Sequence, residues 1–231
     1  MKNKFCSLCL GLLVLFFISS YLSGKEETDQ MTKENQKKLE KLPEPRKKGA
    51  LSLEECIQKR RSKRSFDSKE LTREEISQLL WSLQGITDKT RGFRAAPSAG
   101  ALYPLEIYAV KSEGFYHYTP HDHTLKRLSK KDLREPLTKA ALGQRYIAQA
   151  PFTIVICAVY ERICSRYGER GVMYTHIETG HAAQNLLLQA VALNLGSVPI
   201  GAFREAEVTK ALSLPEAHKP VYILPVGQPL N

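Results

Sequence analysis

The continuous apolar run from Phe152 to Val159 constrains the fold of this 231-residue chain more than any other stretch. A strand with one face in solvent alternates apolar and polar residues, and this run does not. It therefore predicts a central strand whose sheet is covered on both faces. The length is sufficient for one well-buried domain and too short for two.

Other segments predict the elements around this strand. Leu105–Val110 and residues 115–118 alternate as strands do, and Val221–Val226 is the last predicted strand. Helices are predicted to begin at two capping boxes, Ser52-x-x-Glu55 and Thr72-x-x-Glu75. Residues 171–195 predict a long helix that is apolar nearly all round from Ala182 onward, so it must be buried inside the domain or against a second copy.

The first fifty residues differ in composition from the rest. Residues 1–24 have a charged start and an apolar core, which indicates a signal peptide or a membrane anchor. Residues 25–50 are rich in Lys and Glu and lack aromatic residues, so we expect a charged flexible linker and a folded domain over 51–231. We expect an exported or membrane-anchored protein whose only membrane contact is this N-terminal segment.

Charge and metal-binding residue types exclude several functions. The net charge is +10, but the cations are scattered and mixed with acids, and no zinc-finger or RNA-stacking pattern is present, so we expect no nucleic-acid partner. Cys56, Cys157 and Cys164 have no metal-ligand spacing, and we predict neither a disulfide framework nor a metal site. The pairs His121/His123 and His176/His181 are interpreted as structural.

Two motifs carry the chemistry. Arg60-Arg61-Ser62-Lys63-Arg64-Ser65-Phe66 gathers four cations and two hydroxyls directly after a predicted helix. Guanidinium groups and a hydroxyl suit a phosphate monoester, although a solvated basic helix end is the simpler alternative. About thirty residues later comes Pro97-Ser98-Ala99-Gly100-Ala101-Leu102-Tyr103-Pro104, whose small residues let the backbone approach a ligand closely.

The sequence contains no nucleophile, metalloprotease, P-loop or dinucleotide-binding motif. An enzyme without its own acid, base and nucleophile usually depends on a cofactor. Read together, the segments resemble the nitroreductase superfamily of flavoproteins, and within it the SagB/ThcOx-type oxidoreductases. The resemblance covers roughly residues 52–229 and rests on five stretches in order, namely 57–66, 97–104, 141–151, 180–190 and 195–203.

The resemblance implies an α+β nitroreductase-like fold, with a central, mostly antiparallel sheet flanked by helices, and a homodimer with FMN at the subunit interface. It implies that Arg60, Ser62 and Arg64 contact the phosphate, the ribityl chain and the pyrimidine of FMN, and that Gln144 also binds the pyrimidine. The contacts to the flavin ring are implied to come from residues 97–99 of the partner subunit and from residues 200–202. Tyr103 either projects toward the substrate pocket or packs before Pro104, and no catalytic residue is assigned. The implied cofactor-binding residues are Arg60, Arg61, Ser62, Arg64, Pro97, Ser98, Ala99, Gln144, Ile200, Gly201 and Ala202.

The implied activity is hydride transfer through flavin N5 to or from a small-molecule substrate. Relatives of the SagB type oxidise azolines, which indicates a dehydrogenase, whereas a nitro- or quinone reductase would use NAD(P)H as its donor. The sequence does not choose between these directions. The alternative from a different class is an exported or membrane-tethered protein that binds a flavin or another ligand without turnover.

Overall fold

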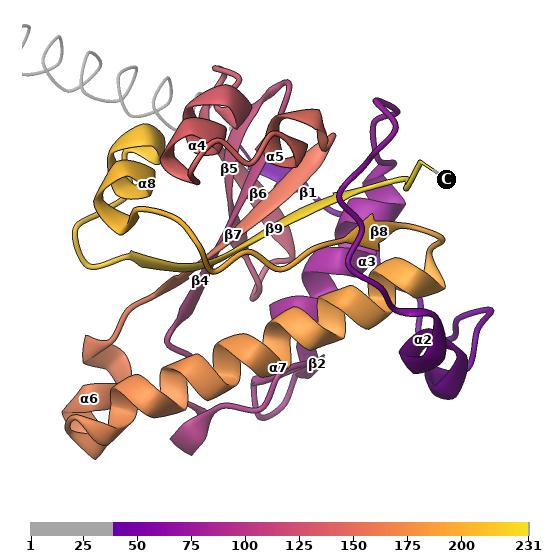
Figure 1. Cartoon of the computed structure of the whole chain (residues 1–231). Coiled ribbons are helices and arrows are strands. Elements are labelled where there is room, and N and C mark those ends of the chain that lie inside the picture. Colours follow the sequence, from indigo (N-terminus) through magenta and orange to yellow (C-terminus); the bar gives the residue numbers. More distant parts are fainter. Residues whose placement is uncertain (1–38, 231) are drawn as a thin grey trace, which may run out of the picture. The chain divides into compact units, whose positions relative to one another are not determined.

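A computed structural model describes residues 39–230, and Figure 1 shows their arrangement. The predicted leader and most of the predicted linker, residues 1–38, lie outside the described residues. Among residues 39–230, no helix combines the length and apolarity that a membrane span requires.

A seven-stranded sheet has the order β1-β6-β5-β4-β7-β9-β8, and the pairs from β6 through β8 are antiparallel. This confirms the predicted α+β class and its central antiparallel sheet. The strands are β1 Leu39–Lys41, β4 Leu105–Lys111, β5 Gly114–Thr119, β6 Thr124–Ser129, β7 Phe152–Ala158, β8 Gly196–Ser197 and β9 Lys219–Gly227. A separate ribbon pairs β2 Ile86–Asp88 with β3 Phe93–Arg94.

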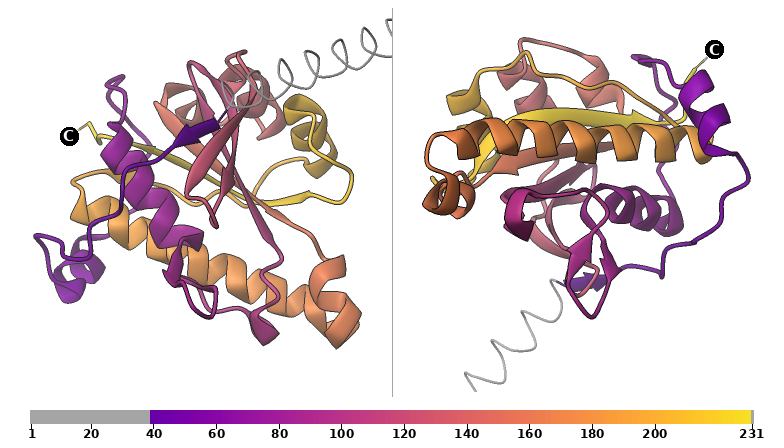
Figure 2. Two further views of the ribbon diagram at one scale, coloured as in Figure 1. Left: turned by 180° about the vertical axis from the view of Figure 1, so that it is seen from behind. Right: turned by 90° about the horizontal axis from the view of Figure 1, so that it is seen from below.

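Helices cover both faces of the sheet, as Figures 1 and 2 show. They are α2 Leu53–Lys59, α3 Arg73–Gln84, α4 Arg134–Ala140, α5 Tyr146–Gln149, α6 Glu161–Tyr167, α7 Arg170–Ala192 and α8 Glu205–Leu212, with a 3-10 turn at Ala99–Ala101. Side chains of α3 and α7 share one core with Ile154 and Ile156 of β7. Val155 and Cys157, on the other face of β7, share the second core with α4, α5 and α8.

All seven residues of β7 are buried, as the apolar run predicts. Both capping boxes are present: the hydroxyls of Ser52 and Thr72 accept hydrogen bonds from the backbone N–H groups of Glu55 and Glu75. Cys157 is fully buried, and burial raises the pKa of its thiol far above the usual range, which fits an inert core residue.

The packed part of the chain begins before the predicted boundary at Leu51. Leu42 lies in the first core, and its N–H donates to the carbonyl of His123 at 3.0 Å. The Ser77 hydroxyl donates to the carbonyl of Pro43, and the Gln78 amide hydrogen-bonds both backbone groups of Arg46. The predicted linker is therefore wrong for residues 39–48, because these bonds reach partners more than thirty residues away and leave no local signal.

His123 has a structural role, as predicted for this histidine. One ring nitrogen, Nε2, lies 2.7 Å from the Ser77 hydroxyl, and Nδ1 lies 2.8 Å from the Tyr118 hydroxyl. The imidazole therefore joins the start of the packed chain to α3 and to β5.

Replacing Leu42 with alanine tests whether residues 39–48 belong to the folded domain. The Leu42 side chain is only 5% exposed, so Leu42→Ala should lower the free energy of unfolding by roughly 2–4 kcal/mol in urea titrations. Leu53→Ala is the control, because Leu53 is 60% exposed, and it should change stability by less than about 0.5 kcal/mol. Equal small effects would contradict the packing of this segment.

Candidate functional site

The basic segment after α2 runs extended along the edge of the sheet. Ser62 pairs with Ser197 of β8, and the N–H of Lys63 donates to the Ser197 carbonyl at 3.0 Å. Buried Phe66 then pairs with Pro229, which fixes the end of the segment. These contacts fix the backbone of the segment. Residues 61–64 are exposed, so their side chains can contact a ligand.

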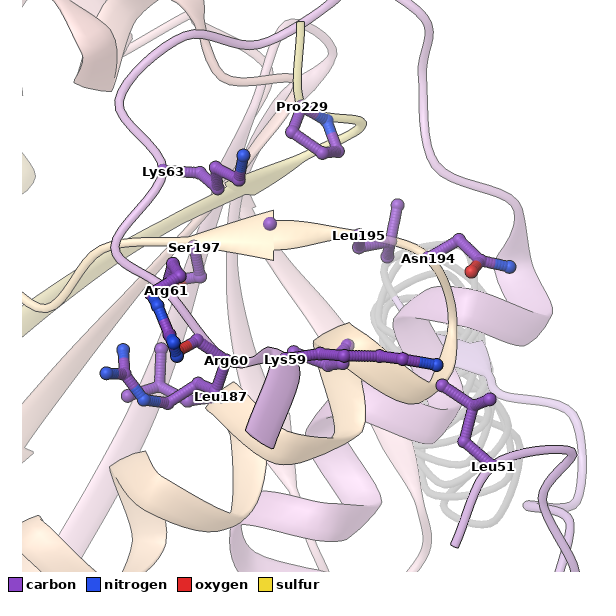
Figure 3. Close-up of a pocket in the computed structure, with 12 residues that line it drawn as sticks. Leu51, Lys59, Arg60, Arg61, Lys63, Leu187, Asn194, Leu195, Ser197 and Pro229 are labelled. Carbon is purple, nitrogen blue, oxygen red and sulfur yellow. The ribbon is translucent and has the colours of Figure 1, made fainter. Parts of the chain in front are cut away.

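The cations of this segment surround a cavity of about 280 Å³, drawn in Figure 3. The predicted Arg60 and Arg61 line it, together with Lys59 and Lys63, and side chains of α7 form its apolar wall. Ser62 and Arg64 do not line it, because successive side chains of an extended segment point to opposite sides. Lys59 and Lys63 belong to the same basic run of the sequence, so this run could have predicted them as site residues as well.

Within residues 39–230, no ion pair involves Arg60, Arg61, Lys63 or Arg64. The Arg61 guanidinium donates only to backbone carbonyls, those of Gln58 and Arg60. Cations this close together repel one another unless an anion lies among them. The segment is therefore chemically suited to hold a phosphate.

The second predicted segment, around Pro97-Ser98-Ala99, is a tightly braced loop. Ala101 and Tyr103 have positive φ angles of 54° and 48°, which are unfavourable for residues with a side chain. The Ser98 hydroxyl accepts from the Tyr103 N–H at 2.9 Å, and the Arg162 guanidinium donates to the Tyr103 carbonyl at 3.1 Å. These bonds hold the loop in its strained conformation.

The side chain of Tyr103 contacts Arg94 of the same chain. Its hydroxyl accepts from the N–H of Arg94 at 3.2 Å, and the Arg94 guanidinium lies 4.4 Å from its ring centroid. These contacts favour the packing role over a substrate-pocket role for this tyrosine.

Beneath the loop lies a buried carboxyl that sequence reasoning missed. Glu178 of α7 is 1% exposed; its Oε1 accepts from the Gln84 amide at 3.3 Å, and its Oε2 has no partner among the described residues. Burial raises the pKa of Glu178 to about 7, against the nearby Ser98 hydroxyl and the Gln84 amide, which lower it. No motif marks this residue, because its partners come from α3 and from the loop.

The third predicted group lies on and around the segment after β8. Ile200 forms both backbone hydrogen bonds with Ile223 and is only 3% exposed, so the residue belongs to the core. Gly201 and Ala202 are exposed. The Gln144 amide donates to the carbonyls of Ala141 and Ala202, so it braces this segment.

The structure of one chain does not bring the basic segment and the loop together. Leu187 lines the basic cavity, whereas Glu178 lies beneath the loop, and nine residues of helix separate them by about 13 Å along the axis. A ligand bound by both segments would need the loop of a second subunit, as the sequence resemblance implies.

Comparisons with known proteins place these features in a family. The Nitroreductase family matches residues 57–228. A nitroreductase-type protein of Methanocaldococcus jannaschii is 43% identical over 187 residues, which cover 78% of this chain and 93% of that protein.

Solved structures have the same fold. A nitroreductase-type protein of Ralstonia eutropha superposes with a TM-score of 0.77 at 27% identity, covering 84% of this chain and 90% of the other. The NADPH:FMN oxidoreductase of Vibrio harveyi, solved with NAD+, gives a TM-score of 0.59 at 24% identity over 78% of this chain and 69% of its own. At that identity the second likeness shows the fold alone.

The buried Glu178 carboxyl should make stability fall as the pH rises. Its pKa of about 7 exceeds the ordinary 4.5, so the unfolded chain loses this proton first and the folded state is penalised by roughly 3 kcal/mol above pH 7. Glu178→Gln should remove that penalty, and urea titrations at about pH 5 and pH 8 would measure it. Exposed Glu216→Gln is the control, and a wild-type protein equally stable at both pH values would contradict the assignment.

Proposed function

The chain belongs to the nitroreductase family and is an oxidoreductase, and from this premise we propose that it binds FMN between two subunits and transfers a hydride between a nicotinamide and a second small molecule. The observation that carries the proposal is the row of cations at Arg60, Arg61, Lys63 and Arg64, which lie beside the Ser197 hydroxyl and form no ion pair within residues 39–230. An NADPH-flavin oxidoreductase of Vibrio harveyi is 29% identical over 114 residues, which cover 46% of this chain and 48% of that protein, and this supports the choice of a flavin and a nicotinamide donor.

The residues fit a flavin nucleotide on physical grounds. The phosphate would lie on the side of the extended segment that Ser62 and Arg64 face, with Arg60 at its start and opposite the side lined by Arg61 and Lys63. There, guanidinium donors and a hydroxyl would form charge-assisted hydrogen bonds. The Ser197 Oγ is buried without a partner among the described residues, at the point where Lys63 and Ser62 meet β8. A polar atom left unpaired in this position is consistent with a ligand that completes the site.

The apolar face of α7 supports the homodimer. Met173 and Ile177 lie one turn apart and are 41% and 46% exposed, and neighbouring Val172 is 38% exposed. Large apolar side chains gathered on one helix face indicate a surface that another protein covers. A two-fold pair of α7 helices would cover this face and would also bring Pro97, Ser98 and Ala99 of each subunit toward the basic segment of the other.

When bound, FMN supplies the redox chemistry, because its ring accepts and returns a hydride at N5. This chain's residues bind and orient it: the cations hold the phosphate, and the braced loop at Ser98 presents a rigid edge. Gly201 and Ala202 leave the space beside the ring open. The resemblance allows two directions, that of a SagB-type dehydrogenase and the reduction of nitro compounds or quinones by NAD(P)H.

We also propose that residues 1–24 export the protein or tether it to a membrane, which leaves the flavin domain outside the cytoplasm. The charged start and apolar core of these residues support this location.

Purified protein lacking residues 1–24 should be yellow and contain one FMN per subunit. Replacing both Arg60 and Arg64 with alanine should weaken FMN binding roughly 100-fold or more, because each of the two lost charge-assisted hydrogen bonds contributes about 1.5–3 kcal/mol. Lys89→Ala removes an exposed cation from the β2–β3 turn and should leave FMN affinity unchanged. Colourless protein that cannot be reconstituted with FMN would overturn the proposal, and bound flavin that NAD(P)H never reduces would indicate binding without turnover.

A further inference from the structure

A second cavity, of about 590 Å³, lies beside the segment after β8 that contains the predicted ring contacts Gly201 and Ala202. Gly201 and Phe203 of that segment line it together with the N-terminal half of α7 and the start of β9. It shares no lining residue with the basic cavity around Arg60. If the flavin ring lies over Gly201, this cavity adjoins the reacting face.

Two polar side chains of the cavity form a hydrogen-bonded pair. The hydroxyl of Tyr160 lies 2.7 Å from Nε2 of His176, and the rings meet edge to face with centroids 5.8 Å apart. His176 is exposed in the single chain. Burial, followed by the charge of Glu205, raises the pKa of Tyr160, which keeps its hydroxyl protonated at neutral pH.

The remaining walls select the shape and charge of a ligand. Phe203 and Tyr222 present aromatic rings, which favour a planar ligand. Gly180 stands inside α7, where glycine is less stable than alanine, and nothing lies within 4 Å of the position a Cβ would occupy, so this part of the cavity wall is open. The carboxylate of Glu205 lines the same cavity, so a neutral ligand is favoured over an anionic one.

We propose that this cavity binds the oxidising substrate, a neutral planar compound with a carbonyl or quinone oxygen, and that Tyr160 donates a hydrogen bond and then a proton to that oxygen, with His176 behind it as the proton source. This inference rests on the proposed flavin function. It adds the acid that the sequence motifs do not contain.

The step balances for a quinone acceptor. The substrate receives two electrons and one hydrogen as hydride from the reduced flavin, whose electrons come from the nicotinamide. The O–H bond of Tyr160 breaks, and its proton forms the new bond at the acceptor oxygen. The protonated imidazole of His176 returns a proton to Tyr160 through their hydrogen bond and is reprotonated by water, and the product is the hydroquinone.

Binding can be measured without turnover, because oxidised flavin cannot reduce a quinone. With FMN-loaded protein and 1,4-naphthoquinone as the probe, perturbation of the visible flavin spectrum gives the dissociation constant. Tyr160→Phe keeps the ring and removes the hydroxyl, and it should weaken binding about tenfold, as expected for one lost neutral hydrogen bond. With NADPH as donor it should also lower kcat roughly 100-fold through loss of the acid.

His176→Asn separates the two roles of the pair. Asparagine can still donate an amide N–H to the Tyr160 hydroxyl oxygen but does not relay a proton, so naphthoquinone affinity should stay within about twofold while kcat falls about tenfold. The matched control is Tyr108→Phe, because the Tyr108 hydroxyl also lies 2.7 Å from a histidine nitrogen, Nδ1 of His218, and neither residue lines this cavity. It should alter neither constant.

The outcomes separate this inference from the function on which it rests. Protein that binds no FMN would refute the proposed function. Protein that binds FMN and is reduced by NADPH, but whose quinone affinity and kcat are unchanged by Tyr160→Phe, would overturn only the role of the Tyr160–His176 pair.

Discussion

The burial of β7 on both faces is the constraint on which the rest of the structure depends. Its side chains alternate between two cores, so helices must cover both sides of the sheet. One of these helices, α7, runs along the sheet beside β9, as the views in Figure 2 show. Three parts of the candidate site then lie near α7: the basic segment near Leu187, the braced loop near Glu178, and the second cavity at Gly180.

The braced loop shows how the fold maintains an unfavourable backbone. Two non-glycine residues with positive φ make it strained, and the ion pair between Glu106 and Arg162 holds the guanidinium that binds the Tyr103 carbonyl. Burial raises the pKa of Glu106, but hydrogen bonds from His117 and Arg162 outweigh burial and lower it to about 2. The depressed pKa corresponds to roughly 3 kcal/mol of stability, present above about pH 4.5 and lost as the pH falls toward 2. The Glu106 carboxylate thus stabilises the loop through Arg162, which is a physical reason for an acidic residue directly after the 97–104 motif.

The sequence predicted those parts of the fold that have local signals. The capping boxes at Ser52 and Thr72, the apolar strand and the long helix are each readable within one segment. Residues 39–48, β6 and α6 were not predicted, since their patterns are weak and their partners are distant. Of the site, the basic run and the small-residue loop were found from composition, whereas Glu178 and the bracing role of Gln144 depend on contacts between remote segments.

The Tyr160–His176 pair explains why motif reading found no acid. Tyr160 precedes α6 and His176 lies in α7, sixteen positions later, with the chain reversing at Gly168, whose φ of 54° suits glycine. No fixed spacing along one helix or strand would bring these two side chains within hydrogen-bonding distance. The turn between two helices does so, and it places both side chains in the cavity that includes Gly201. In a fold whose cofactor performs the redox chemistry, the remaining polar groups need only bind and supply protons, so they can come from segments that carry no signature.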